Sequence, residues 1–163
     1  MEIGIRMALD EDVDTFVEFA VKLSIFNRNN HSIECKYDDY ELVLSSIRER
    51  AKATFKNRNE DTLILIAEID RIPIGYALGK IFEQEGTTDN GTGKMGLFDE
   101  LFVDVSTRGF GIGRKLIDAV THWMKEKGIN RIKLHAYSWN NNAKRLYEKY
   151  GFMEYAVSYE KFI

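Results

Sequence analysis

The first half of the chain changes from an alternating to a helical pattern of apolar residues. Residues 3–7 alternate between apolar and polar, which predicts a short strand because successive side chains of a strand point to opposite faces. Over residues 13–23 and 40–55 the apolar positions recur at steps of three and four, which predicts two amphipathic helices. The polar stretch 27–32 is expected to end the first helix.

Apolar runs of strand length dominate the second half. The expected strands cover residues 62–70, 74–82, 97–105, 131–139 and 152–162, and the expected helices cover residues 112–127 and 140–150. Gly128 and Gly151 follow these helices, at the position where a left-handed residue commonly ends a helix. Residues 83–96 are polar and rich in glycine, which predicts a hairpin loop. This order predicts one α/β (α+β) domain over residues 1–163, with a mixed sheet and helices on both faces.

Composition and charge narrow the class of protein. Of the 163 residues, 44% are hydrophobic and 30% are charged, and the formal net charge is −3. Without a basic block, the chain is not expected to bind nucleic acid through phosphate neutralisation. Its single cysteine, Cys35, allows no internal disulfide, which fits a reducing cytoplasm. We expect neither a membrane segment, for which roughly 20 consecutive apolar residues would be needed, nor a metal site.

A glycine-rich segment, RGFGIGRKL at residues 108–116, stands between an expected strand and an expected helix. Its glycines do not match the G-x-G-x-x-G of dinucleotide-binding folds, and the G-K-S/T of a phosphate loop does not follow. The first helical turn still exposes backbone N–H groups at its positive end, and glycines leave room beside them. With Arg108 and Arg114 nearby, the segment predicts a pyrophosphate site. The alternative is a tight turn that binds nothing.

Two motifs resemble those of the GCN5-related N-acetyltransferase (GNAT) superfamily. FVDVSTRGFGIGRKLI resembles the family's acetyl-CoA motif Q/R-x-x-G-x-G/A, with Arg108, Gly111 and Gly113 at the defining positions. NNNAKRLYEKYGF resembles the family's N-x-x-A-x-x-L-Y-x-x-x-G-F. The residues at its defining positions are Asn140, Ala143, Leu146, Tyr147, Gly151 and Phe152. The likeness includes the order of the elements and extends over nearly the whole chain.

The resemblance implies both a fold and a cosubstrate. The fold would be a GNAT-type central mixed, mostly antiparallel, twisted sheet of six to seven strands flanked by about four helices. Acetyl-CoA would bind with its pyrophosphate on the glycine turn and with its pantetheine arm along the preceding strand, where parallel strands splay apart. The implied binding residues are Phe102, Val103, Asp104, Val105, Arg108, Gly109, Phe110, Gly111, Ile112, Gly113, Arg114, Asn140, Ala143 and Tyr147.

Acetyl transfer to an amine needs a base for the amine, donors for the developing oxyanion and a proton donor for the leaving thiolate. The resemblance implies that Tyr147 is the general acid; the alternative is an aromatic residue packed on the sheet. Asp99 and Glu100 are adjacent on a strand, so alternation predicts that only one faces the substrate. His135, expected in mid-strand, is a third candidate base or a structural core residue. Asn140 is expected to cap the last helix and to hydrogen-bond near the cosubstrate.

The acceptor is expected to be a cationic small-molecule amine, such as a polyamine, an aminoglycoside or an amino-acid-like compound. Acidic residues outside the two motifs motivate this expectation. The residues expected near the acceptor are Phe26, Asn27, His31, Tyr37, Asp38, Asp39, Glu83, Glu85 and Asp89. Acetylation of protein N-termini or lysines is one alternative, and a non-catalytic acyl-CoA sensor is another. The resemblance also allows a homodimer through the C-terminal strands.

Overall fold

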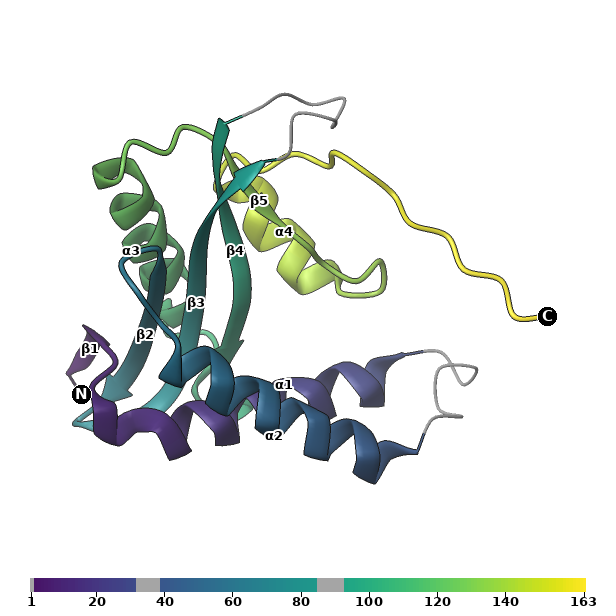
Figure 1. The fold of residues 1–163 in the computed structure, drawn as a ribbon, viewed down its shortest axis with the longest axis horizontal. Helices are drawn as coiled ribbons and strands as arrows, with labels where there is room; N and C mark the ends of the chain where they lie inside the picture. The colour runs from purple at the N-terminus through teal and green to yellow at the C-terminus, as the bar shows by residue number, and fades with distance from the viewer. Residues whose placement is uncertain (1, 32–38, 85–92) are drawn as a thin grey trace.

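The computed structural model describes residues 2–31, 39–84 and 93–163, which form one mixed sheet with helices on both faces (Figure 1). The strands are β1 (Ile3–Met7), β2 (Thr62–Ile69), β3 (Ile72–Gln84), β4 (Gly93–Val103) and β5 (Ile132–Leu134). The helices are α1 (Val13–Asn30), α2 (Tyr40–Lys56), α3 (Ile112–Glu126) and α4 (Asn141–Lys149), with the 3-10 helices η1 (Asp10–Asp12) and η3 (Val105–Thr107). Neighbours in the order β1-β2-β3-β4-β5 pair antiparallel, except β4 and β5, which run parallel.

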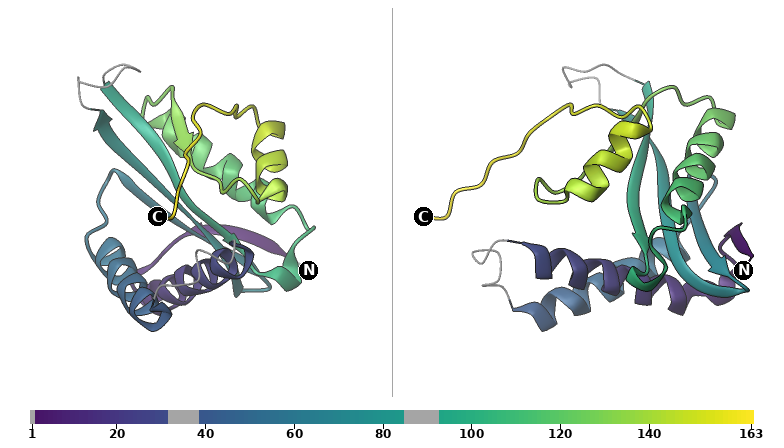
Figure 2. Two further views of the ribbon diagram at one scale, coloured as in Figure 1. Left: turned by 90° about the vertical axis from the view of Figure 1, so that its right-hand side faces the viewer. Right: turned by 180° about the vertical axis from the view of Figure 1, so that it is seen from behind.

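Helices α1 and α2 cover one face of the sheet and α3 covers the other, as the two views of Figure 2 show. The core under α1 and α2 includes Phe16, Phe19, Ile66, Tyr76, Leu78 and Phe102. The core under α3 includes Leu65, Ala77, Phe98, Leu116 and Val120. Helix α4 packs at the edge of this second core through Leu146 and Tyr147. Both faces of β2 and β3 are therefore buried, which explains why their sequences are nearly continuously apolar.

The described residues contain five strands where the resemblance implies six to seven. The strand expected over 152–162 is absent, because residues 152–163 run as an extended segment away from the sheet (Figure 1). Met153 and Tyr159 in this segment are 84% and 91% exposed. The strand expected over 131–139 ends at Leu134. Alternation alone is thus insufficient, since a strand also needs a neighbouring edge with which to exchange hydrogen bonds.

Several other boundaries differ from the sequence-based expectation. Helix α1 continues through the polar stretch to Asn30 and ends at His31, whose backbone N–H bonds to carbonyls of the last turn. Strands β3 and β4 extend into the segment expected as a loop, so Glu83 lies in β3 rather than in a loop. Asp39 is the N-cap of α2 and accepts a hydrogen bond from the Leu42 N–H at 3.2 Å. Cys35, Tyr37, Asp38, Glu85 and Asp89 lie outside the described residues.

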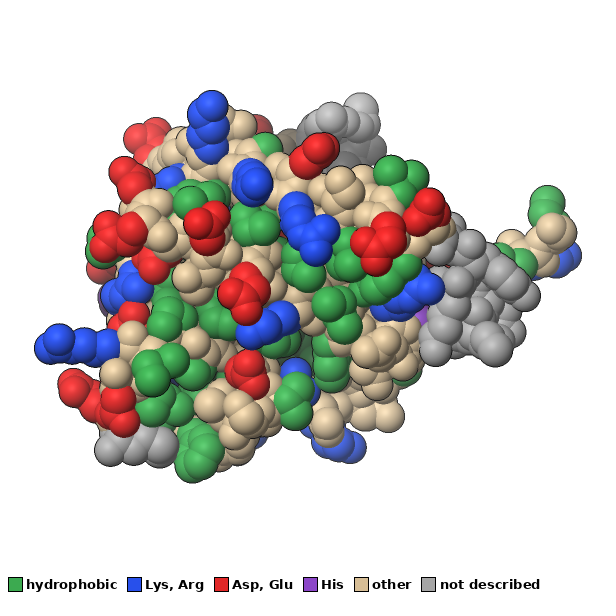
Figure 3. Space-filling model, turned by 90° about the horizontal axis from the view of Figure 1, so that it is seen from below, with side chains coloured by type: hydrophobic (Ala, Val, Ile, Leu, Met, Phe, Trp, Pro, Cys, Tyr) green, Lys and Arg blue, Asp and Glu red, His purple; other side chains and the backbone are tan. Residues whose placement is uncertain are grey.

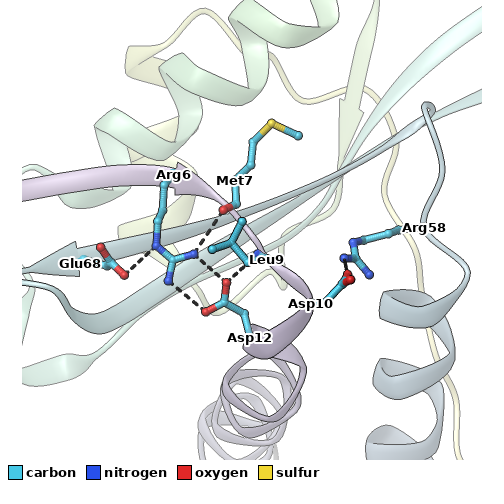
Figure 4. A network of polar contacts seen from close by, with 7 residues as sticks. All are labelled: Arg6, Met7, Leu9, Asp10, Asp12, Arg58 and Glu68. Atoms are coloured by element: carbon cyan, nitrogen blue, oxygen red, sulfur yellow. Dashed lines mark hydrogen bonds and ion pairs between the residues drawn. The ribbon is translucent and has the colours of Figure 1, made fainter.

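An ion-pair network fastens β1 to β2 and to the start of α1 (Figure 4). The Arg6 guanidinium donates to both carboxylate oxygens of Asp12, at 2.6 and 2.9 Å, and its Nε donates to Glu68 at 2.8 Å. Asp12 also accepts a hydrogen bond from the Leu9 N–H at 2.7 Å, so one carboxylate binds both the Arg6 cation and the backbone of the turn before α1. These contacts hold the pKa of Asp12 below its usual range, mainly through the hydrogen bonds from Arg6.

The outer face of α1 and α2 carries interspersed positive, negative and apolar side chains (Figure 3). Exposed apolar residues on these helices include Ile25 and Leu42, which are 37% and 65% exposed. Within the described residues, none of the helices combines the length and apolar character that crossing a membrane requires.

Candidate active site

Strand β4 contains one residue more than its partner β3 at the centre of the sheet. Leu78 pairs with Glu100, and the next residue of β3, Gly79, pairs with Phe98. Asp99 is therefore the extra residue of a β-bulge. Bulges redirect side chains, and this one contains Asp99 and adjoins Glu100, the two acidic candidates of the predicted site.

The bulge turns both acidic side chains to the same face of the sheet. Glu100 accepts a hydrogen bond from the Tyr76 hydroxyl, and Asp99 forms an ion pair with Lys80. Tyr76 and Lys80 lie four residues apart on β3, on the face covered by α1 and α2. The prediction that only one of the two acids faces the substrate region is thus wrong, because the bulge interrupts the period of two.

Strands β4 and β5 part directly before the bulge. Their parallel pairing ends at Phe98 and Leu134, whereas β4 continues to Val103. The Asp104 N–H bonds to the β3 carbonyl of Ile74 at 2.8 Å, so alternation directs the Val103 backbone groups to the opposite edge. Beyond Phe98, therefore, this edge of β4 has no strand partner among the described residues, which is the splay that the resemblance implies.

A cavity of about 680 Å³ opens beside the bulge. Helices α1 and α2 form one wall, and β4 with the segment from β5 to α4 forms the other. The cavity brings together eight residues named from the sequence: Asn27, His31, Asp99, Glu100, His135, Asn140, Ala143 and Tyr147. Its volume lies in the range of small-molecule sites, which are roughly 300–1,000 Å³.

Glu100 is the candidate base whose proton affinity the fold raises. Burial raises the pKa of the Glu100 carboxyl above its usual range, and the neighbouring Asp99 adds to the increase. The Tyr76 hydroxyl opposes this effect by donating a hydrogen bond of 2.5 Å to the carboxylate. Tyr76 is itself fully buried, and its pKa lies well above the usual range because of that burial. A carboxyl group with a raised pKa in a cavity is suited to accept and release a proton.

The other two candidate bases have different environments. The Asp99 carboxylate forms an ion pair with the Lys80 ammonium at 2.7 Å, so a cation of the protein already balances its negative charge. His135 follows the end of β5 and is exposed, although it lines the cavity. The expectation that His135 lies in mid-strand is wrong, because β5 ends one residue before it.

Tyr147 and Asn140 lie on α4 and at its start, at the wall opposite α1 and α2. Tyr147 is half-buried, and this burial raises the pKa of its phenol. The phenol is therefore protonated at neutral pH and able to donate a hydrogen bond. The side chain of Asn140 accepts the Ala143 N–H at 3.2 Å, which confirms that Asn140 caps the last helix.

The glycine turn after β4 ends at the N-terminus of α3. Gly109 and Gly111 have φ values of 89° and 77°, a left-handed conformation that glycine adopts without strain. A Cβ atom added to either glycine would meet nothing within 4 Å, so the space above the turn is open. The backbone N–H groups of the first helical turn lie at this opening, where the helix dipole favours an anion.

The two arginines expected to add charge at this turn have partners elsewhere. Arg108 Nε donates to the Val103 carbonyl at 3.0 Å, and its guanidinium lies 4.6 Å from the centroid of the Phe26 ring. Arg114 pairs with Asp118 on the exposed side of α3, at 3.7 Å. The attraction for an anion thus comes mainly from the helix terminus itself.

An aromatic cluster that the sequence does not predict joins the two walls of the cavity. Trp139 Nε1 donates to His31 Nδ1 at 3.0 Å, and Tyr137 meets the His31 ring edge-on at 4.4 Å. Phe26 packs against Trp139 at 6.0 Å. Phe26 and His31 are among the residues expected near the acceptor, whereas the apolar pattern predicts a strand at Tyr137 and Trp139.

Three further residues at or beside the cavity carry no local signal in the sequence. They are Tyr76, Lys80 and Arg50. Nothing in their immediate sequence distinguishes them from ordinary core or surface residues, so only the tertiary structure identifies them.

Comparisons with known proteins agree on one family. A sequence model described as the acetyltransferase (GNAT) family matches residues 25–152. A spermine/spermidine N(1)-acetyltransferase of Bacillus subtilis (strain 168) is 34% identical over 80 residues, which are 48% of this chain and 51% of that protein. The chain spans between 18% and 58% of the length of the curated relatives it matches.

Solved structures share the fold over the full chain. A predicted acetyltransferase from Clostridium acetobutylicum, crystallised with acetyl-CoA, superposes with a TM-score of 0.72 at 21% identity and covers 99% of this chain and 96% of its own. An aminoglycoside acetyltransferase from an uncultured soil metagenomic sample, in complex with sisomicin, gives a TM-score of 0.65 at 20% identity with the same coverage of both chains.

Proposed function

The chain belongs to the acetyltransferase (GNAT) family, and from this membership we propose that it transfers the acetyl group of acetyl-CoA to the primary amine of a small molecule. The observation that carries the proposal is the cavity beside the β4 bulge, where Glu100 and Tyr147 line the same space. One group is a carboxyl with a raised pKa and the other a phenol that keeps its proton. Amine acetylation needs this pair of proton acceptor and donor.

The chain offers acetyl-CoA two backbone features. The open glycine turn at Gly109 and Gly111, with the N–H groups of the first turn of α3, suits the pyrophosphate. The edge of β4 beyond Phe98 has backbone groups that suit the amides of the pantetheine arm. The residues of β4 and of this turn implied by the resemblance would hold the cosubstrate, and Arg108 would stay against β4.

Bound acetyl-CoA supplies the acetyl group as a thioester, so a C–N bond forms as the C–S bond breaks. Free primary amines of the lysine type titrate near 10.4 and are protonated at neutral pH, so the attacking nitrogen must first lose a proton. Glu100 takes that proton, because burial keeps its carboxyl more basic than an exposed glutamate. Tyr147 gives its proton to the departing thiolate and regains one from the nitrogen, which loses its second proton as the amide forms. Backbone N–H groups of the β4 edge stabilise the developing oxyanion.

The size of the cavity and its two walls support a small acceptor rather than a protein segment. Its lining comes from α1, α2, β4 and α4, so it is walled on both sides. One relative is named a spermine/spermidine N(1)-acetyltransferase, and one solved structure of the same fold is an aminoglycoside acetyltransferase in complex with sisomicin. Acetylation of peptide α-amines is the alternative within the same reaction class.

The proposal is tested by measuring thiol release from acetyl-CoA with a panel of small amines and with peptides that carry a free α-amine. We expect release with at least one small amine and none above background with the peptides. Turnover confined to peptides would contradict the small-molecule acceptor. Tight acetyl-CoA binding without release by any amine would contradict an enzymatic function and favour a sensor.

A matched pair of glycine variants tests the cosubstrate site. Gly111 and Gly128 flank α3, and both have a φ near 77°, so glutamate strains the backbone equally at either position. Gly111→Glu places a carboxylate at the proposed pyrophosphate site and is expected to weaken acetyl-CoA binding by about 100-fold or more. Gly128→Glu lies at the opposite end of the helix and is expected to bind acetyl-CoA as the wild type does. Equal affinities for the two variants in titration calorimetry would contradict the site.

A further inference from the structure

The acidic residues of the acceptor cavity are both engaged by groups of the protein itself. Among its described lining residues the carboxylates are Asp99 and Glu100. Asp99 is bound to Lys80, and Glu100 accepts the Tyr76 hydroxyl and has a raised pKa. A polyamine or aminoglycoside carries several ammonium groups, and these two acids offer it little free negative charge.

Arg50 brings a positive charge to the same cavity from the opposite wall. It lies on α2 within the stripe Val43, Ile47, Arg50 and Thr54, whose spacing of three and four residues faces the cavity. Its charge acts across the cavity, since it partly opposes the rise that burial causes in the pKa of both Glu100 and Tyr76. Within the described part of the chain, no carboxylate forms an ion pair with Arg50.

An arginine beside a small-molecule cavity suits an anionic group of a ligand. The planar guanidinium binds a carboxylate or phosphate through two parallel hydrogen bonds, and such charge-assisted pairs are about twice as strong as neutral ones. A second ammonium group near Arg50 would instead meet a like charge, which selects against polycations. The two walls thus carry groups that match the two ends of such a ligand: the proton acceptor Glu100 on β4 and the permanently charged Arg50 on α2.

We infer that the acceptor is an amine that also carries an anionic group, an amino acid in its simplest form. Arg50 binds the anionic group, and the amine lies at Glu100. This inference rests on the proposed acetyltransferase function and narrows its substrate class. It selects the amino-acid-like compound among the three kinds of amine expected from the sequence, and it assigns to α2 a specificity-determining residue outside the two family motifs.

The test uses amines that differ only in the anionic group. Thiol release from acetyl-CoA is measured with L-amino acids and ω-amino acids of two to six carbons, each beside its carboxamide and the alkylamine that lacks the carboxylate. We expect kcat/KM for the best amino acid to exceed that of its alkylamine by about 10- to 100-fold. Phosphoethanolamine beside ethanolamine shows whether a phosphate replaces the carboxylate.

Two arginine variants of α2 test whether Arg50 causes the preference for the amino acid over its alkylamine. Arg50→Gln is expected to abolish the preference for the amino acid over its alkylamine, mainly by raising KM for the amino acid. The ratio of the two substrates cancels any change that the lost charge causes at Glu100. Arg48→Gln removes an arginine of α2 outside the cavity lining and is expected to keep the preference.

The outcomes separate this inference from the proposed function. Faster turnover of spermidine or of alkylamines than of every anionic amine would overturn the inference while keeping the acetyltransferase. An equal loss for both substrates in Arg50→Gln would also overturn it. The absence of release with every amine would overturn the proposed function, and the inference with it.

Discussion

Two carboxyl groups enclosed by the fold have opposite environments. Asp12, at the start of α1, accepts two hydrogen bonds from the Arg6 guanidinium, and its pKa is lowered (Figure 4). Glu100, at the β4 bulge, accepts one hydrogen bond from the neutral Tyr76 hydroxyl, and its pKa is raised mainly by burial. Asp12 is buried and Glu100 is half-buried, and the effect of burial is overcome only at Asp12, whose partner is a cation.

The difference distinguishes a structural acid from a chemical one. A cation at 2.6 Å fixes the charge of Asp12, and a fixed charge can hold a turn and two strands but cannot exchange a proton easily. The neutral Tyr76 hydroxyl does not offset the free-energy cost of burying a negative charge at Glu100. The carboxyl therefore binds a proton more strongly than an exposed glutamate and can serve as a proton acceptor. The comparison predicts that isosteric amides at the two positions affect different properties of the protein.

The largest effect is expected at the bulge. Glu100→Gln keeps the shape of the side chain and removes the base, so kcat/KM for the accepted amine should fall by about 100- to 10,000-fold. Steady-state kinetics with acetyl-CoA at saturation measure the loss, and thermal unfolding shows whether the fold is kept. Asp99→Asn is the matched control in the same cavity and is expected to lower kcat/KM less than about tenfold. A larger loss in Asp99→Asn than in Glu100→Gln would transfer the role of base to Asp99.

The second effect is expected in stability rather than in rate. Asp12→Asn leaves Arg6 with Glu68 as its carboxylate partner and removes a charged acceptor, which should lower the free energy of unfolding by about 2 kcal/mol. Urea denaturation measures this change, and kcat/KM should stay within about twofold of wild type. Asp10→Asn serves as the control, because Asp10 lies on the same turn but is 96% exposed in its ion pair with Arg58. Equal destabilisation by both variants would contradict the structural role assigned to Asp12.

Local signals in the sequence were sufficient for the features that depend on local chemistry. The glycine turn, the start of α3 at Ile112 and the cap at Asn140 follow from the conformational freedom of glycine and the hydrogen bonding of asparagine, so their residues could be named in advance. The order of the elements likewise followed from periodicity up to α4.

Features that depend on distant partners were missed. The bulge at Asp99 arises because β3 and β4 fall out of register, and neither strand carries a local mark of it. The alternation of residues 152–162 is typical of a strand, yet no edge among the described residues pairs with it. Arg50 occupies a helical position that resembles a solvated surface residue, and only the packing of α2 across from β4 places it at the cavity. These features lie at the site or beside it, where specificity depends on tertiary contacts.

The smallest expected effect is a difference in how stability depends on pH. The pKa of Asp12 is lowered from an unfolded value near 3.8, so the folded protein binds fewer protons there than the unfolded chain. Its contribution to stability is present above that value and is lost as pH falls through the folded pKa. The pKa of Glu100 is raised from an unfolded value near 4.5, so the folded protein binds more protons in the window above it. Stability therefore declines as pH rises through that window.

Asp12→Asn and Glu100→Gln each remove one of these two opposite contributions to the pH dependence of the free energy of unfolding. Urea denaturation between pH 3 and pH 8 gives the unfolding free energy of wild type, Asp12→Asn and Glu100→Gln, and a tenfold change in an acid's dissociation constant on folding corresponds to about 1.4 kcal/mol. The wild-type advantage over Asp12→Asn should shrink as pH falls below about 4, because the unfolded wild-type chain then takes up a proton at Asp12 more readily than the folded protein does. Glu100→Gln should instead gain stability relative to wild type as pH rises above about 4.5, because it avoids burying a charge. Slopes of the same sign at both positions would show that Glu100 is held as an ion like Asp12, and the contrast between the two acids would then fail.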